Sequence, residues 1–171
     1  MKTVVVVGMS MGAASSIVAA ARGKAWIDMV VAESPFASLH DVVLNHVNNW
    51  IERKRHRIGT LCDMLSYGSS SLVYAVTSYA QWRGNADPEF KWPIDIVHEI
   101  SPHPLLLIHG TGDPICPFSH SERLYAAAGE PKSFWRHETS VHAIAFFTTS
   151  QQLYHSTIHN FIQSHHERSK I

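Results

Sequence analysis

A short segment framed by glycines, residues 8–12 (Gly-Met-Ser-Met-Gly), could carry a nucleophile. It follows the β-branched run Val4–Val7 and opens the alanine-rich stretch Met11–Arg22. A strand, a tight turn and a helix in this order suit a nucleophile elbow, in which the serine hydroxyl projects beyond the end of the strand. We expect a strained backbone at Ser10, with the Met11 N–H directed at a developing oxyanion. The alternative is a glycine-rich turn without chemistry. A phosphate loop is disfavoured because no lysine follows the second glycine.

A candidate carboxylate, Asp113, follows the apolar run Leu105–Ile108 across a turn that contains Gly110 and Gly112. A carboxylate at the end of a buried strand can orient a histidine and stabilise the imidazolium that the histidine becomes. Taken alone, Asp113 could equally cap its own turn.

His142 is the candidate general base, because it lies in a loop after the expected strand Ser133–His137. A base must reach both the serine hydroxyl and the carboxylate. If Ser10, Asp113 and His142 form one site, we expect the Ser10 and His142 side chains within about 4 Å of each other.

The other twelve of the 13 histidines have no comparable placement. His109 precedes the turn of the candidate acid, and we expect it to be a packed or turn residue. His155 and His159 have helical i, i+4 spacing that could hold a metal, but no third ligand is sensibly spaced. We therefore expect a solvated helix face there.

Alternating strands and helices predict a parallel α/β sheet of about four strands with flanking helices. Val4–Val7 is expected to be buried on both faces, as parallel strands usually are. The expected strands are Val4–Val7, Asp28–Ala32, Leu105–Ile108 and Ser133–His137. The expected helices are Met11–Arg22, ended by Gly23, then Leu39–Ile58, Ser119–Ala128 and Gln151–His166.

The stretch from about residue 40 to residue 90 is too long for an ordinary connection. We interpret it as a helical lid inserted into a single domain of residues 1–171, whose core comprises residues 1–39 and 91–171. Its apolar residues predict a pocket for acyl or aromatic groups over the strand ends; the alternative is that they only pack the helices together. They include Trp50, Met64, Tyr67, Tyr74 and Trp82.

Composition narrows the classes of function. Lysine plus arginine and aspartate plus glutamate both number 14, so the charge balance does not favour nucleic acid. The run Val4–Val7 is too short for a signal peptide or a membrane span. Cys62 and Cys116 could form one disulfide, but two cysteines are weak evidence for secretion. We expect both to be reduced thiols in a cytoplasmic protein. We expect no metal and no organic cofactor.

Four segments together resemble the serine-hydrolase branch of the α/β-hydrolase superfamily, near the dipeptidyl-aminopeptidase and acylaminoacyl-peptidase-like hydrolases. These segments are Gly8–Gly12, Ala32–Phe36, Pro104–Pro117 and Ser119–Tyr125. Ser, Asp and His occur here in the chain order of that superfamily. The resemblance implies a catalytic triad of Ser10, Asp113 and His142, and hydrolysis of an ester, thioester or amide in a small acyl or peptide-like substrate.

Two departures from the resemblance bear on activity. Val141 stands where relatives usually have a glycine before the histidine. Relatives also have several strands, a first helix and a loop before the elbow strand. That loop supplies the second oxyanion donor. We therefore expect Val4–Val7 to offer an unpaired edge, through which the chain forms a homodimer, binds an N-terminal half-protein or aggregates. The alternative functions are a weak or inactive hydrolase that needs a partner chain, and a binding module.

Overall fold

The chain folds into two units, one built on a β-sheet and one made of two long helices. The computed structural model describes residues 3–23, 25–58, 60–83, 91–138, 141–149 and 151–166. The sheet unit comprises Met1–Ala37 with Lys91–Ile171, and the helical unit comprises Ser38–Phe90. The helical unit spans the stretch for which we expect a lid. That it covers the strand ends stays a prediction.

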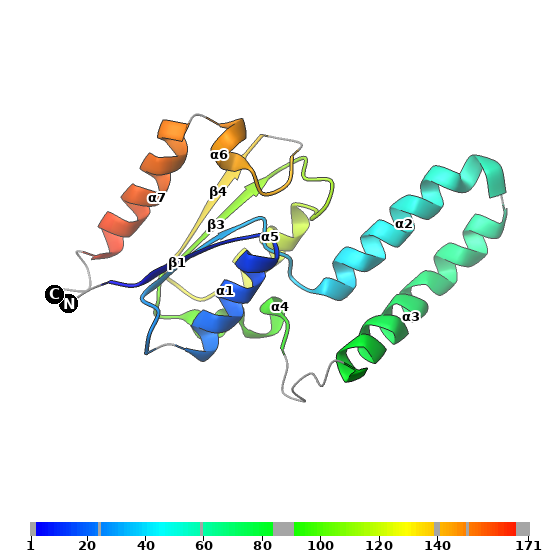
Figure 1. The fold of residues 1–171 in the computed structure, drawn as a ribbon, viewed down its shortest axis with the longest axis horizontal. Helices are drawn as coiled ribbons and strands as arrows, with labels where there is room; N and C mark the ends of the chain where they lie inside the picture. The colour runs from blue at the N-terminus through cyan, green and yellow to red at the C-terminus, as the bar shows by residue number, and fades with distance from the viewer. Residues whose placement is uncertain are drawn as a thin grey trace. The chain divides into compact units, whose positions relative to one another are not determined.

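The sheet has four parallel strands in the order β1-β2-β3-β4 (Figure 1), as the sequence predicts. The strands are β1 (Val5–Met9), β2 (Met29–Glu33), β3 (Leu105–Gly110) and β4 (Lys132–His137). Because all four run in one direction, their carboxyl ends share one side of the sheet, where α/β proteins place their sites. Ser10 directly follows β1, and Asp113 follows β3.

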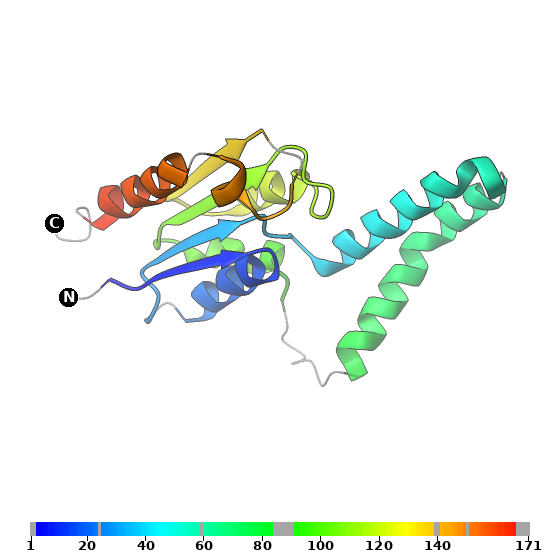
Figure 2. The same ribbon diagram turned by 45° about the horizontal axis from the view of Figure 1, so that its top comes forward.

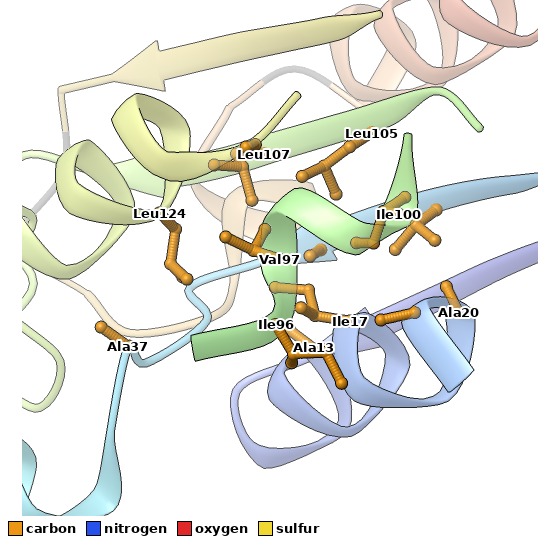
Figure 3. Close-up of a cluster of buried hydrophobic side chains, with 14 residues drawn as sticks. Ala13, Ile17, Ala20, Ala37, Ile96, Val97, Ile100, Leu105, Leu107 and Leu124 are labelled. Carbon is orange, nitrogen blue, oxygen red and sulfur yellow. The ribbon is translucent and has the colours of Figure 1, made fainter. Parts of the chain in front are cut away.

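Both faces of β2 and β3 are buried, because helices cover the sheet on each side (Figure 2). Val30 and Leu107 belong to the core on one face, and Val31 and Leu106 to the core on the other. Figure 3 shows the first core, where Ile17, Val97 and Leu124 meet. The first face carries α1 (Met11–Arg22), α4 (Pro93–Ile96), the 3-10 helix η1 (Val97–Ile100) and α5 (Ser119–Ala127). The second face carries α6 (Ala145–Thr148) and α7 (Gln151–His166).

The expectation that Val4–Val7 is buried on both faces is wrong. Val7 is 52% exposed and Val4 is 47% exposed. The physical reason is that β1 lies at the edge of the sheet formed by the described residues and pairs with β2 alone.

Backbone hydrogen bonds show which residues of β1 face that open edge. The Val4 carbonyl accepts from the Met29 N–H, and the Ser10 N–H donates to the Glu33 carbonyl. Main-chain groups of successive residues point to opposite sides of a strand. The main-chain groups of Val5, Val7 and Met9 therefore face away from β2.

The helical unit consists of α2 (Leu39–Ile58) and α3 (Thr60–Arg83). The Ser69 hydroxyl donates a 2.8 Å hydrogen bond from α3 to Asn48 Oδ1 on α2, and Ile51 is buried. Trp50 and Tyr74 are both more than half exposed. The Tyr74 ring on α3 still meets the His40 ring on α2 edge to face, with ring centroids 5.7 Å apart, so Tyr74 helps to pack the two helices together. The side chains of residues 64, 67 and 82 lie outside the described residues. No helix among those described is long and apolar enough to cross a membrane.

Candidate active site

The turn between β1 and α1 presents Ser10 in a strained conformation, as the sequence predicts. Ser10 has φ 53° and ψ −118°. An L-residue in such a region costs about 1–3 kcal/mol, which the surrounding structure must offset. One restraint is visible, since the Ser10 N–H donates to the Glu33 carbonyl at 2.9 Å.

The two glycines that frame the turn differ in their roles. A Cβ at Gly8 would overlap the Gly12 carbonyl and lie 2.5 Å from the Ser16 hydroxyl oxygen, so β1 and α1 can approach only with glycine there. A Cβ at Gly12 would meet no atom within 4 Å. Steric crowding therefore requires glycine at position 8 but not at position 12.

Asp113 lies in the turn after β3, and its two oxygens have different partners. Oδ1 accepts hydrogen bonds from the backbone N–H groups of Ile115 at 2.9 Å and Cys116 at 3.0 Å. Oδ2 lies 2.6 Å from His142 Nδ1. The carboxylate thus caps its own turn and also faces the histidine, so the two readings of Asp113 are compatible.

Hydrogen bonds decide the charge state of Asp113. Burial of the carboxyl group by itself would raise its pKa. The side-chain hydrogen bonds from His109 and His142, and those from the backbone of Cys116 and Ile115, outweigh burial and hold the pKa well below its usual range. Asp113 is therefore ionised at neutral pH and can only accept hydrogen bonds.

His142 joins the other two residues. Its Nδ1 lies 2.6 Å from Asp113 Oδ2, and its Nε2 lies 2.7 Å from Ser10 Oγ. These distances confirm the predicted proximity of Ser10 and His142. Because an ionised Asp113 only accepts, the proton resides on Nδ1, and the Ser10 hydroxyl donates to Nε2. Val141 does not prevent this placement; the left-handed backbone falls instead on Ala143, with φ 50°.

His109, expected to be a packed or turn residue, is also in contact with the candidate acid. Its Nε2 lies 2.9 Å from the Cys116 carbonyl and 3.3 Å from Asp113 Oδ2. A carbonyl only accepts, so Nε2 carries the proton and Nδ1 accepts from the Ser121 hydroxyl at 2.6 Å. A polar residue ending the apolar run Leu105–Ile108 was the available signal for this contact.

The remaining site predictions have simple outcomes. Met11 is the first residue of α1, and its side chain is 71% exposed. His155 and His159 lie on an exposed face of α7, as expected. Cys116 is a free, buried thiol. Burial and the nearby Asp113 charge raise the pKa of this thiol to about 12.

Known proteins resemble the chain in sequence and in fold. The protein YfhR of Escherichia coli O157:H7 is 41% identical over 68 residues, which cover 40% of this chain and 24% of YfhR. An esterase of Pyrococcus furiosus superposes with a TM-score of 0.63 at 17% identity, covering 95% of this chain and 54% of that one. An acylaminoacyl peptidase superposes with a TM-score of 0.61 at 15% identity, covering 94% of this chain and 23% of the peptidase.

Identity this low in the two solved structures shows the fold alone, which is that of α/β-hydrolases. The chain spans about half the length of the Pyrococcus esterase and less of the other two proteins. A family model described as the prolyl oligopeptidase family matches residues 1–166. The resemblance inferred from the sequence is confirmed at this level. The chain therefore belongs to the prolyl oligopeptidase family.

Proposed function

We propose that this chain is the catalytic part of a serine hydrolase, which cleaves an ester, thioester or amide through an acyl-enzyme on Ser10. The observation that carries the proposal is the continuous path from Ser10 Oγ to His142 Nε2, at 2.7 Å, and from His142 Nδ1 to Asp113 Oδ2, at 2.6 Å. The fold of the esterase and peptidase neighbours supports a small acyl or peptide-like substrate.

In the acylation step, Ser10 Oγ attacks the substrate carbonyl carbon while its proton moves to His142 Nε2. The ionised Asp113 stabilises the imidazolium and keeps the other proton on Nδ1. The tetrahedral intermediate collapses when the bond to the leaving group breaks, and the leaving group takes the proton from Nε2. The acyl group then remains on Ser10 Oγ.

In the deacylation step, water attacks the acyl carbon and gives a proton to His142 Nε2. The bond to Ser10 Oγ breaks, the serine regains the proton, and the acid leaves. We assign one oxyanion donor to the Met11 N–H, which follows the nucleophile at the start of α1. A missing second donor would cost about 3–4 kcal/mol of transition-state stabilisation.

The open edge of β1 favours a second candidate, a weak hydrolase that needs a partner chain. Val7 and Met9 are more than half exposed, and their main-chain groups face away from β2. An edge with β-branched residues and no charge is a template for another strand. We propose that this edge binds a second copy or an N-terminal half-protein, and that turnover by the chain alone is slow.

We also propose a cytoplasmic location. The support is chemical: Cys116 is a free thiol whose Sγ lies 3.4 Å from the Pro35 carbonyl in the buried interior. A free buried thiol suits a reducing compartment.

A fluorophosphonate probe tests the proposal directly. The probe should add to the peptide that contains Ser10 in the purified wild-type chain. Labelling should be lost in Ser10→Ala and fall by several orders of magnitude in His142→Ala, because the residues act as a unit. Ser15→Ala removes an exposed serine from the same helix and should leave labelling unchanged. Labelling elsewhere, or none at all, would contradict the proposal.

A further inference from the structure

The last residue of β2 and the residue after it, Glu33 and Ser34, contact the segments of all three proposed catalytic residues. Each is 1% exposed. The Glu33 carbonyl accepts the hydrogen bond of the Ser10 N–H at 2.9 Å. The Ser34 N–H donates at 2.8 Å to the carbonyl of Ile108, in the strand that leads to Asp113.

The side chains of these two residues reach the segment of residues 141–145 that carries His142, here called the base loop. Glu33 Oε1 accepts from the Ala145 N–H at 2.7 Å, and Ser34 Oγ accepts from the Ala143 N–H at 3.2 Å. Ala143 lies one residue after His142, and Ala145 lies three residues after it. The loop is thus bonded on its far side to the same strand end that holds Ser10.

The second oxygen of Glu33 has a different partner. Oε2 accepts from the Tyr154 hydroxyl of α7 at 2.9 Å. Burial, and then the charge and hydrogen bond of Glu33, raise the pKa of Tyr154 above its usual value, so the phenol keeps its proton and acts as the donor. Each oxygen of the buried carboxylate thus has its own donor, Oε1 the Ala145 N–H and Oε2 the Tyr154 hydroxyl.

Taking a carboxylate out of water is costly, and an apolar side chain would fill the same space without that cost. A buried glutamate is worth keeping where its oxygens satisfy donors that would otherwise be unpaired. Here those donors are the Ala145 N–H and the Tyr154 hydroxyl.

We propose that Glu33 is a positioning residue, whose carboxylate anchors the base loop at Ala145 while its carbonyl anchors Ser10, so that His142 Nε2 stays in reach of Ser10 Oγ. The proposal rests on the proposed function and adds a residue to it. Ser34 supplies a second anchor to the same loop, two residues earlier.

Three variants separate this role from general stabilisation. Glu33→Leu keeps the approximate size and removes both acceptors. Glu33→Gln keeps a carbonyl acceptor for the Ala145 N–H. Tyr154→Phe keeps the Glu33–Ala145 hydrogen bond and removes only the other partner of the carboxylate, so it is the matched control.

The first readout is the rate of fluorophosphonate labelling at Ser10 per folded molecule, with the folded fraction taken from urea denaturation. Small displacements of reacting groups reduce rates steeply, so Glu33→Leu should label about tenfold more slowly or worse. Glu33→Gln should label within about threefold of wild type, and so should Tyr154→Phe. Equal labelling by Glu33→Leu and wild type would overturn the proposal. So would equal slowing in Glu33→Leu and Tyr154→Phe, because that pattern belongs to destabilisation.

The second readout is hydrogen exchange at the amides of residues 141–147, which needs no activity. Exchange there should be faster in Glu33→Leu than in Tyr154→Phe. If the wild type does not label, the proposed function fails, and exchange still decides whether Glu33 anchors the loop. Unchanged exchange in Glu33→Leu would overturn the proposal whatever the labelling shows.

Discussion

At the scale of single residues, Asp113 combines two tasks that usually fall to different groups. Oδ1 holds the turn through the N–H groups of Ile115 and Cys116, while Oδ2 faces His142 and His109. Loss of its negative charge should therefore affect both stability and chemistry.

The first prediction concerns how the contribution of the Asp113 charge to the stability of the fold depends on pH. The pKa of Asp113 is lower in the folded chain than the value of about 3.9 expected for an unfolded one. The unfolded state therefore takes up the proton first as the pH falls. The stabilisation is complete above the unfolded pKa, and it is lost as the pH falls from there towards the folded pKa. Asp113→Asn should have a lower free energy of unfolding than wild type at pH 7. This difference in unfolding free energy should shrink below about pH 4.

Urea denaturation at several pH values between 3 and 7 measures this difference. Glu122→Gln, which removes an exposed carboxylate from α5, is the control. A gap between wild type and Asp113→Asn that does not change with pH would contradict the prediction. Labelling of Ser10 in Asp113→Asn should also fall, by about 10⁴-fold if the tautomer of His142 depends on Asp113 as in other Ser-His-Asp sites.

The second prediction concerns His109, which lies behind Asp113. His109→Phe fills a similar volume but leaves the Cys116 carbonyl and the Ser121 hydroxyl without their partner. The free energy of unfolding should fall by about 1–3 kcal/mol, the usual cost of unpaired buried polar groups. Ser121→Ala removes only the hydroxyl that donates to His109, and should cost about 1 kcal/mol. Calorimetry of both variants measures these losses. A larger loss of unfolding free energy in Ser121→Ala than in His109→Phe would contradict the prediction.

At the scale of elements, the packing of β1 on α1 sets the geometry of the turn. The two glycines of the turn offer a matched pair, since one has no space for a Cβ and the other has open space.

The third prediction uses this pair. Gly8→Ala forces a Cβ against the Gly12 carbonyl, which belongs to the backbone and cannot easily move. It should cost about 1–3 kcal/mol, as overpacking does, and should displace Ser10. Gly12→Ala lies in the first turn of α1 and should be neutral or stabilising by up to about 1 kcal/mol, because alanine favours helix. Unfolding curves of both variants check this. Similar losses in both would mean that the open space at Gly12 is needed for something else.

At the scale of the whole molecule, β1 is an edge strand of the sheet that the described residues form, and in that sheet it pairs with β2 alone. Val7 combines an exposed side chain with main-chain groups that face the open edge.

The fourth prediction concerns self-association through this edge. Val7→Lys puts a charge on the edge, which is how natural sheets discourage strand pairing. Because Val7 is 52% exposed, the change should alter the free energy of unfolding by no more than about 0.5 kcal/mol. Light scattering should show that wild type associates with rising concentration and that Val7→Lys associates less.

Val76→Lys is the control, since Val76 is 55% exposed but lies in α3. It should associate like wild type. A monomeric wild-type chain with ordinary esterase rates would contradict both the proposed edge interface and the proposed slow turnover.

Much of the fold was predictable from local patterns. Short strand-like runs and alanine-rich or periodic stretches act over a few residues, so they located the four parallel strands and the helices α1, α2, α5 and α7. They did not locate α3 (Thr60–Arg83), which was expected only as part of a helical lid. The short elements α4, η1 and α6 have four residues each, too few to show a period. The proximity of Ser10, Asp113 and His142 was predictable because each follows a parallel strand, and such strand ends meet on one side of a sheet.

The remaining features depend on contacts between distant residues, which only the tertiary structure decides. The edge position of Val4–Val7 was expected from the family resemblance, and among the described residues β1 does pair with β2 alone. The exposure of Val7 was not expected, because an apolar run alone does not report which elements pack against its side chains. The contact of His109 with Asp113 depends on how the turn folds back. Glu33 and Ala145 are 112 residues apart in sequence, and no local pattern reports that hydrogen bond. Sequence alone thus determined the strands, four of the longer helices and the residue types of the site, because those signals are local. The tertiary structure decided which buried polar groups pair, because pairing depends on where the folded chain brings each donor and acceptor.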